Sequence, residues 1–196
     1  MDYLIRDMQF TDLESIAKLV THSWQENYKN IIHQSTLDKL NWQEKAQAFK
    51  ERYGDNKSTT FIAENKKNSD VLGFVSFGSL RDSNRLQSDD NYHLFPYSGE
   101  IYAIYLSNQF KGFGIGSALL KSAFLALKKN NRHDIMIWTL KENILAQRFY
   151  QRHGGVESDI RKIEVDGRFY YEVQYRYDLS KLHHDEISEN NTLSKV

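Results

Sequence analysis

The segment Lys111-Gly112-Phe113-Gly114-Ile115-Gly116-Ser117-Ala118-Leu119-Leu120 carries three glycines at alternate positions. It follows an apolar run from Ile101 to Leu106 and continues into apolar residues at helical spacing. A strand, a glycine-rich turn and the start of a helix are therefore expected in this order. Glycine lets the backbone turn tightly and approach a ligand, and the first N–H groups of a helix lack partners within it. A pyrophosphate is the natural ligand of such a turn.

Two other phosphate-binding motifs are excluded at this turn. The dinucleotide fingerprint Gly-x-Gly-x-x-Gly would need a third glycine where Ser117 or Leu119 stands. The P-loop would need a Gly-Lys-Ser/Thr sequence, which the chain lacks. Taken alone, the segment is also compatible with a purely structural turn between a strand and a helix.

The composition of the 196 residues narrows the classes of function. Lys and Arg total 26, as do Asp and Glu, so the formal net charge of zero gives no electrostatic support for binding nucleic acid or an anionic membrane. The lack of cysteine excludes disulfides, thiolate catalysis and cysteine-ligated metals. The histidines show no metal-binding spacing, and the sequence has no signal-peptide pattern and no apolar run of about 20 residues. We therefore expect a cytoplasmic protein without a metal, a nucleic-acid partner or a membrane partner.

Apolar periodicity and turn residues predict one domain over residues 1–179 and a polar C-terminal tail over 180–196. The expected fold class is mixed α/β (α+β), with the order β-α-α-β-β-β-α-β-α-β-β and helices on both faces of the sheet. Residues 81–98 are expected to form a long polar loop. The predicted strands span residues 3–6, 59–64, 71–79, 101–106, 134–140, 156–165 and 168–178.

Capping residues and turn signals predict where several elements begin and end. Thr11 and Glu14 have the spacing of a capping box for the first helix. Ser35 is expected to open a second helix that runs toward Tyr53. Asp166-Gly167 is a strong two-residue turn signal, so the last two strands should form a hairpin.

The segment from Asn143 to Tyr150 is the second informative one. Seven residues make nearly two helical turns, so both side chains lie on the same side of a helix predicted over residues 143–153. Ala146 lies between them and leaves a shallow track with an amide at one end and a phenol at the other. An amide can pair with a peptide-like chain, and a phenol can deliver a proton. The same residues also fit a helix-capping Asn and a core Tyr.

In this order, the two segments resemble the GNAT superfamily of acyl-CoA N-acyltransferases. The family pattern Gln/Arg-x-x-Gly-x-Gly/Ala falls on residues 111–116, where Lys111 replaces the usual Gln or Arg, and an overlapping frame over residues 109–114 satisfies the pattern. The second family motif is matched by Asn143, Ala146, Phe149-Tyr150 and Gly154-Gly155. The resemblance covers about residues 3–179 and implies a GNAT-like, mostly antiparallel seven-stranded sheet.

The resemblance implies acetyl-CoA as the cosubstrate and suggests how it binds. The pantetheine arm would pair with the main chain of the central strand near Ile104 and Leu106, and Asn143 would meet the arm. Lys111 would add positive charge or simply be solvated. The pyrophosphate would lie on the segment Lys111, Gly112, Phe113, Gly114, Ile115, Gly116 and Ser117.

The resemblance also suggests the residues that move protons. Glu100 matches the position of a glutamate base in family members that use one on this strand, although it also fits an ordinary polar residue at a strand start. Tyr150 matches the acid that protonates the departing thiolate. The backbone N–H of Tyr105 would bind the tetrahedral oxyanion.

The acceptor side is expected near Trp24, Tyr28 and Tyr171, which also fit roles in packing or covering the core. The expected function is direct transfer of an acetyl group from acetyl-CoA to a primary amine of a small molecule, within a ternary complex. Two alternatives stay open. An N-acetyltransferase for proteins or peptides would need a wide open groove near Trp24 and Tyr171, and a non-catalytic CoA-binding sensor would tolerate the loss of Glu100 and Tyr150. Pairing of the last hairpin could also form a homodimer.

Overall fold

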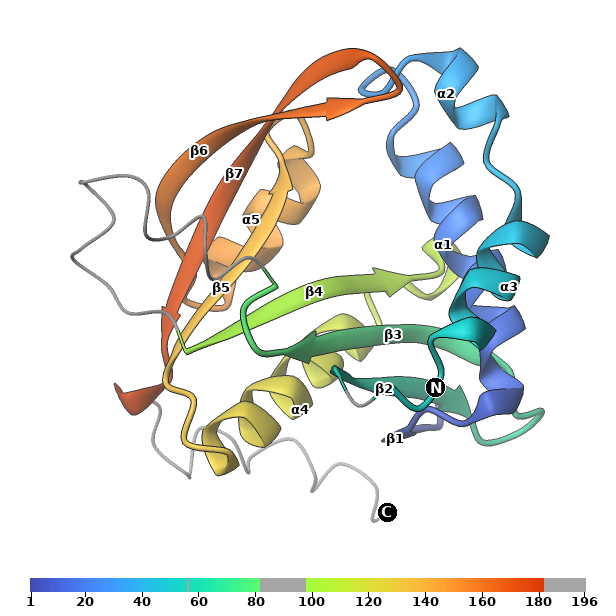
Figure 1. Cartoon of the computed structure of the whole chain (residues 1–196). Coiled ribbons are helices and arrows are strands. Elements are labelled where there is room, and N and C mark those ends of the chain that lie inside the picture. The colour runs from blue at the N-terminus through green and yellow to red at the C-terminus, as the bar shows by residue number, and fades with distance from the viewer. Residues whose placement is uncertain (56, 82–97, 182–196) are drawn as a thin grey trace.

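The computed structural model describes residues 1–55, 57–81 and 98–181. At its centre is a seven-stranded sheet in the order β1-β2-β3-β4-β5-β7-β6 (Figure 1). Neighbouring strands are antiparallel except β4 and β5, which run parallel, so the predicted mostly antiparallel seven-stranded fold is confirmed. The strands are β1 (Tyr3–Asp7), β2 (Ser58–Asn65), β3 (Val71–Gly78), β4 (Gly99–Leu106), β5 (Asp134–Leu140), β6 (Val156–Val165) and β7 (Arg168–Asp178).

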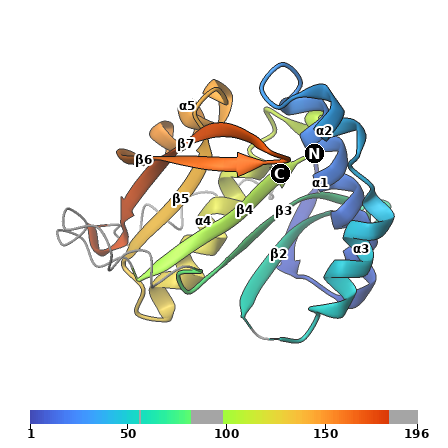
Figure 2. The same ribbon diagram turned by 45° about the horizontal axis from the view of Figure 1, so that its top comes forward.

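Helices pack on both faces of the sheet. The alternation of side chains along β3 shows this, because Phe74 packs with residues of one helix layer and Val75 packs with residues of the other. On the Phe74 face lie α1 (Leu13–Asn27), α2 (Gln34–Asp38) and α3 (Trp42–Glu51), with α1 and α3 side by side (Figures 1 and 2). The opposite layer contains α4 (Ile115–Lys129) and α5 (Ile144–Arg152).

Strands β4 and β5 separate after a short parallel contact. Their pairing joins Gly99–Ile101 to Ile135–Ile137 and stops there, whereas β4 continues to Leu106. On its other edge, β4 remains paired with β3 through a register shift opposite Tyr102, and such a bulge bends and twists a strand. Figure 1 shows the two strands diverging beyond this point. Along the C-terminal half of β4, the backbone N–H and C=O groups on the edge that faces β5 are therefore not hydrogen-bonded to β5.

The second predicted helix is divided in two. The chain leaves α2 after Asp38 and starts α3 at Trp42, where the Asn41 side chain accepts hydrogen bonds from the N–H groups of Gln43 (2.8 Å) and Glu44 (3.4 Å). An Asn that caps a helix start has non-helical backbone angles, so it ends one helix as it begins the next. The expectation of one continuous helix from Ser35 to Tyr53 was wrong for this reason.

The predicted capping box at the first helix was also wrong. Helix α1 begins after Asp12, whose carboxylate accepts hydrogen bonds from the Gln9 N–H (2.7 Å) and from both terminal nitrogens of Arg6 (2.7 and 2.9 Å). Thr11 lies in a preceding 3₁₀ turn, and Glu14 pairs with Lys18 instead. A carboxylate with an arginine partner makes stronger hydrogen bonds than a hydroxyl, which explains why Asp12 holds this junction.

We expect Asp12→Ala to lower the free energy of unfolding by about 2 kcal/mol, because it removes the charged acceptor of the Gln9 N–H and leaves the partly buried Arg6 with Glu64 as its remaining carboxylate partner. Burial would raise the pKa of Asp12, but the hydrogen bonds from Arg6 and Gln9 lower it below its usual range. The stabilisation is therefore present above the unfolded pKa of about 4 and is lost as the pH falls through the lower folded value. Urea titrations at neutral and acidic pH measure both effects, with exposed Asp7→Ala as control. Equal losses in the two variants would contradict this role.

Two parts of the sequence prediction fall outside the described residues. Positions 82–97 of the predicted long loop and positions 182–196 of the predicted tail are not among the described residues. Across the residues that are described, no helix combines the length and apolar character needed to span a membrane.

Candidate active site

The glycine segment forms a turn that most other residues would strain. Gly112 and Gly114 have φ angles of +86° and +77°, which side chains with a Cβ adopt at a cost. Gly114 is the residue that caps the start of α4, and the Ala118 N–H donates to its carbonyl oxygen (3.0 Å). The two left-handed glycines thus set the direction in which the following N–H groups point.

The N–H groups of this turn are open to a ligand. Within the described part of the chain, no backbone or side-chain acceptor pairs with the N–H groups of residues 112–117. Ile115, Gly116 and Ser117 are the first three residues of α4, so their N–H groups lie at the positive end of the helix dipole. This row of donors has the geometry that binds a phosphate or pyrophosphate.

Helix α5 is fixed beside the turn by Phe149 and His153. A Cβ at Gly116 would meet the Phe149 ring at 3.4 Å, so the two helices approach closely there. His153 donates from Nδ1 to the Phe149 carbonyl oxygen (2.7 Å), and its Nε2 lies 2.8 Å from the Ser117 hydroxyl oxygen. The Ser117 side chain is thereby engaged, which leaves its backbone N–H as the group available to a ligand.

Lys111 and Asn143 take part in structural contacts at the two sides of the turn. The Lys111 ammonium donates to Oδ1 of Asn27 (3.0 Å) at the end of α1, and burial lowers the pKa of this lysine while Glu26 opposes the shift. Asn143 caps α5, with Oδ1 accepting from the Ala146 N–H (3.2 Å). The predicted capping alternative is therefore realised, and the Asn143 NH2 group remains a donor toward a passing chain.

The Tyr150 phenol lies in the core, close enough to the Tyr105 phenol of β4 for the two to interact electrostatically. Its side chain is 5% exposed and packs in the main core cluster together with Tyr175, at a ring distance of 5.7 Å. Burial raises the pKa of Tyr150 well above its usual value, and the nearby Tyr105 phenol adds to the shift. Tyr150 therefore keeps its proton through neutral pH and is available as an acid.

Aromatic residues from the C-terminal end of α1 and from β4 meet on the α1 side of the sheet. Trp24 donates from Nε1 to the Tyr105 hydroxyl oxygen (2.8 Å), and its ring stacks edge-on against Tyr28 at 4.9 Å. Burial raises the pKa of Tyr28 strongly, and the Tyr105 phenol raises it further. We call Trp24, Tyr28 and Tyr105 the aromatic cluster. Trp24 and Tyr28 are in contact in this cluster, as their spacing suggested. The Tyr105 side chain joins them, although the sequence suggested only a backbone role for this residue.

The structure does not bring Tyr171 to this cluster. Tyr171 is 47% exposed, and its neighbour Tyr170 points toward α2 instead. Successive residues of a strand face opposite sides of a sheet, so only one of the two can line the α1 side. The sequence could not choose between adjacent tyrosines without the register of the hairpin.

Glu100 lies at the opposite end of β4 from the aromatic cluster. Its side chain is 4% exposed and forms an ion pair with Arg81. Arg81 donates from Nε to Oε1 (2.9 Å), and its backbone N–H donates to Oε2 (3.1 Å). Both carboxylate oxygens therefore have partners in this structure.

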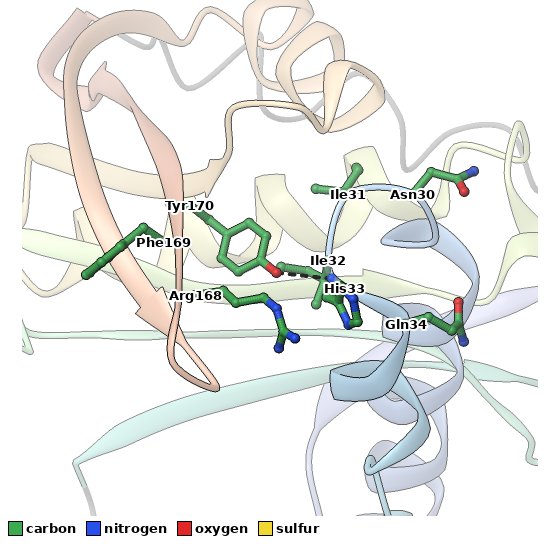
Figure 3. A pocket seen from close by; sticks show the side chains of 8 residues that line it. All are labelled: Asn30, Ile31, Ile32, His33, Gln34, Arg168, Phe169 and Tyr170. Atoms are coloured by element: carbon green, nitrogen blue, oxygen red, sulfur yellow. Dashed lines mark hydrogen bonds between the residues drawn. The ribbon is translucent and has the colours of Figure 1, made fainter.

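The tip of the β6–β7 hairpin is anchored on α2. Asp166 accepts hydrogen bonds from the Thr36 hydroxyl (3.0 Å) and from the Lys39 ammonium (2.8 and 3.0 Å). The His33 N–H donates to the Tyr170 hydroxyl oxygen (3.1 Å), as Figure 3 shows. These contacts join the hairpin to the helical layer and bridge the α1 side of the sheet at this end.

An open cavity of about 430 Å³ lies beside this bridge, lined by residues 30–34 and 168–170. Figure 3 shows Tyr170 pointing across it to Ile32 and His33, while Phe169 points away. Ile32 and Tyr170 also pack with Tyr28, so the cavity adjoins the aromatic cluster. No group of three or more potential metal ligands occurs among the residues described.

Comparisons with known proteins agree with this geometry. Residues 16–155 match the model of the acetyltransferase (GNAT) family. The chain is 31% identical over 139 residues to the uncharacterized N-acetyltransferase YuaI of Bacillus subtilis, which covers 71% of this chain and 72% of YuaI.

Two similar solved structures have the same fold. PaiA N-acetyltransferase from Thermoplasma acidophilum, in complex with coenzyme A, is 20% identical with a TM-score of 0.66 and covers 90% of this chain and 100% of its own. The structure of yncA from Salmonella typhimurium, with its cofactor acetyl-CoA, has a TM-score of 0.64. Its sequence is 17% identical, and the match covers 92% of this chain and 95% of the yncA chain. Because the family model spans β4, the glycine turn and the helix that carries Tyr150, this chain belongs to the GNAT acetyltransferase family.

Proposed function

We propose that the protein transfers an acetyl group from acetyl-CoA to a primary amine of a small molecule, directly within a ternary complex. The observation that carries this proposal is the row of open N–H groups at residues 112–117, next to a strand whose edge ends near the Tyr150 phenol. The PaiA and yncA structures, which contain coenzyme A and acetyl-CoA, support the choice of cosubstrate.

The cosubstrate would follow the separation of β4 and β5. Its diphosphate would lie on the glycine turn, where N–H groups and a helix N-terminus favour a negative charge. The pantetheine arm would pair with the unpaired edge of β4 at Ile104 and Leu106, and the NH2 group of Asn143 would donate to it. This path leads the thioester toward the phenols of Tyr105 and Tyr150.

The chemistry requires one base and one acid. A protonated amine cannot attack a thioester, so a proton must first leave the acceptor, and Glu100 is the base suggested by the sequence. Because Glu100 lies at the opposite end of β4 from the aromatic cluster, it would exchange its hydrogen bonds with Arg81 for a water and take the proton through bridging water molecules. After attack, the C–S bond breaks and Tyr150 protonates the thiolate, while the backbone N–H of Tyr105 would stabilise the oxyanion. After attack, the nitrogen carries two protons; the amide keeps one, and the other leaves the nitrogen and replaces the proton lost by Tyr150.

The anchored hairpin favours a small acceptor over a protein. Asp166 and Tyr170 hold the hairpin against α2, so an extended peptide would have to displace these contacts in order to cross the aromatic cluster. A small amine reaches the same cluster without that cost. The runner-up, a peptide N-acetyltransferase, would instead need this bridge to open.

Calorimetry tests the cosubstrate, and we expect saturable binding of acetyl-CoA in the micromolar range, because several N–H groups and a helix dipole act on one diphosphate. S-acetylpantetheine, which lacks the diphosphate together with the phosphoadenosine, is the control and should bind at least tenfold more weakly. Equal affinity for both ligands would place the binding energy elsewhere. A panel of alkylamines, followed by release of the CoA thiol, then tests the acetyl transfer.

A further inference from the structure

Glu172 is a carboxylate on the α1 side of the sheet that the proposed reaction does not use. It lies on β7, directly across from Leu140 of β5 and Arg161 of β6. Residues paired across strands have their side chains on the same face. Leu140 belongs to the core cluster against which Trp24 and Tyr28 pack, and the Glu172 charge acts on the Tyr28 and Tyr105 phenols, so Glu172 lies near the aromatic cluster.

One oxygen of this carboxylate is engaged and the other is open. Arg161 donates a hydrogen bond from Nε to Oε2 of Glu172 (2.7 Å), and its Nη2 forms an ion pair with the same oxygen (2.6 Å). Among the described residues, none donates to Oε1. The side chain of Glu172 is 18% exposed, and Oε1 is not among the fully buried atoms that lack a partner, so a ligand can reach this oxygen. A carboxylate oxygen without a donor can accept a charge-assisted hydrogen bond from a cation.

Arg161 holds the carboxylate in place from the far side. Its guanidinium group stacks over the Trp138 ring at 4.1 Å, which fixes the arginine on the sheet. With its head group fixed, the hydrogen bond and the ion pair on Oε2 orient the Glu172 carboxylate and leave Oε1 as the accessible oxygen.

The charge of Glu172 acts on the aromatic cluster. Burial is the main cause of the raised pKa values of Tyr28 and Tyr105, and the Glu172 charge adds to both shifts. The two phenols stay protonated as a result, and they present neutral hydroxyl groups beside a negative oxygen. A neutral polar wall with one carboxylate oxygen suits an ammonium group. Glu100 differs, because Arg81 occupies both of its oxygens.

We propose that Oε1 of Glu172 accepts a hydrogen bond from the ammonium group of the acceptor, which makes Glu172 the residue that selects cationic amines. The inference rests on the proposed acetyltransferase function and adds the acceptor class to it: amines that carry a positive charge when they bind. Glu172 acts as a binding and positioning residue, and the subsequent loss of the proton follows the reaction described above.

The test compares a charged and a neutral acceptor of similar size. Benzylamine is protonated at neutral pH, whereas aniline is neutral, so only benzylamine can use the carboxylate. For Glu172→Gln, we expect kcat/KM for benzylamine to fall by about 10- to 100-fold, mainly through KM, because a hydrogen bond between two charged groups is lost. The value for aniline and the affinity for acetyl-CoA should stay within about twofold. Glu172→Asp, which retains the charge, should recover part of the loss.

The control is Glu164→Gln, which removes a carboxylate from an exposed position of the neighbouring strand β6 and should change neither acceptor. If Glu172→Gln lowers kcat/KM equally for benzylamine and aniline, the residue has a structural role and the inference fails. If Glu172→Gln leaves both values unchanged, the ammonium binds elsewhere and the inference also fails. A wild-type enzyme that binds acetyl-CoA but acetylates no amine in an alkylamine panel would overturn the proposed function itself, and the acceptor class with it.

Discussion

Tyr150→Phe is expected to lower kcat by about 100- to 1,000-fold, because general acid catalysis contributes on this scale and the substitution removes only the acidic hydroxyl. The pKa of Tyr150 is raised by burial well above that of an exposed tyrosine, so this acid remains protonated at pH values where an exposed tyrosine ionises. The wild-type rate should therefore show no alkaline decline from this group near pH 10, where an exposed tyrosine would ionise. Steady-state kinetics from neutral to alkaline pH measure both properties.

Tyr175→Phe is the matched control for this prediction. Tyr175 is fully buried in the same core cluster, and its ring contacts that of Tyr150, but its hydroxyl pairs with Gln147 and Gln151 on the outer side of α5. We expect it to alter stability slightly and to leave kcat within a factor of about three. If both variants lose the same activity, the loss reflects packing of the core. If Tyr150→Phe turns over at the wild-type rate, Tyr150 is not the acid.

Gly114→Ala is expected to weaken acetyl-CoA binding by at least tenfold. At φ +77°, an added Cβ favours a different backbone conformation, and the turn can relax only by rotating the N–H groups that follow. The loss of one hydrogen bond to a charged phosphate changes the affinity by about 1.5–3 kcal/mol, which corresponds to 10- to 150-fold. Calorimetric titration with acetyl-CoA gives the affinity directly, and kcat at saturating cosubstrate should change little.

Gly54→Ala separates backbone strain from loss of the ligand site. Gly54 has a φ angle of +88° and, like Gly114, open space around the position of its Cβ, but it lies in the turn after α3, far from the glycine segment along the chain. Both variants should lose about 1–2 kcal/mol of stability through the same strain. Only Gly114→Ala should lose affinity for acetyl-CoA, so equal affinities in the two variants would mean that the glycine turn does not bind the diphosphate.

The cosubstrate side of the site could be predicted because its signals are local. Gly112 and Gly114 need positive φ angles within one turn, and Asn143 and Tyr150 are placed relative to each other by the pitch of one helix. The predicted limits of β5 match the observed Asp134–Leu140, since an unbroken apolar run identifies an interior strand. These features depend on neighbours within a few residues, which the sequence displays directly.

The acceptor side could not be predicted to the same depth. The family model ends at residue 155, so the β6–β7 hairpin with Glu172 lies outside the matched segment. Trp24 and Tyr105 are 81 positions apart, and the hydrogen bond between them depends on which strand lies under α1. The period of two along β7 separates Tyr170 from Tyr171, but only the register with β5 and β6 shows which of them shares a face with the cluster.

The sequence by itself determined the order of the strands along the chain, the glycine turn and the helix that carries Tyr150, because backbone conformation and helical periodicity are set by residues close together in the chain. Only the tertiary structure decided that β4 separates from β5 after Ile101 and that Arg81 donates hydrogen bonds to both carboxylate oxygens of Glu100. It also decided that Glu172 lies near Tyr28. These placements arise from strand register and from packing between distant segments. Such contacts depend on which surfaces meet when the sheet assembles, and the identity of neighbouring residues in the chain does not specify them.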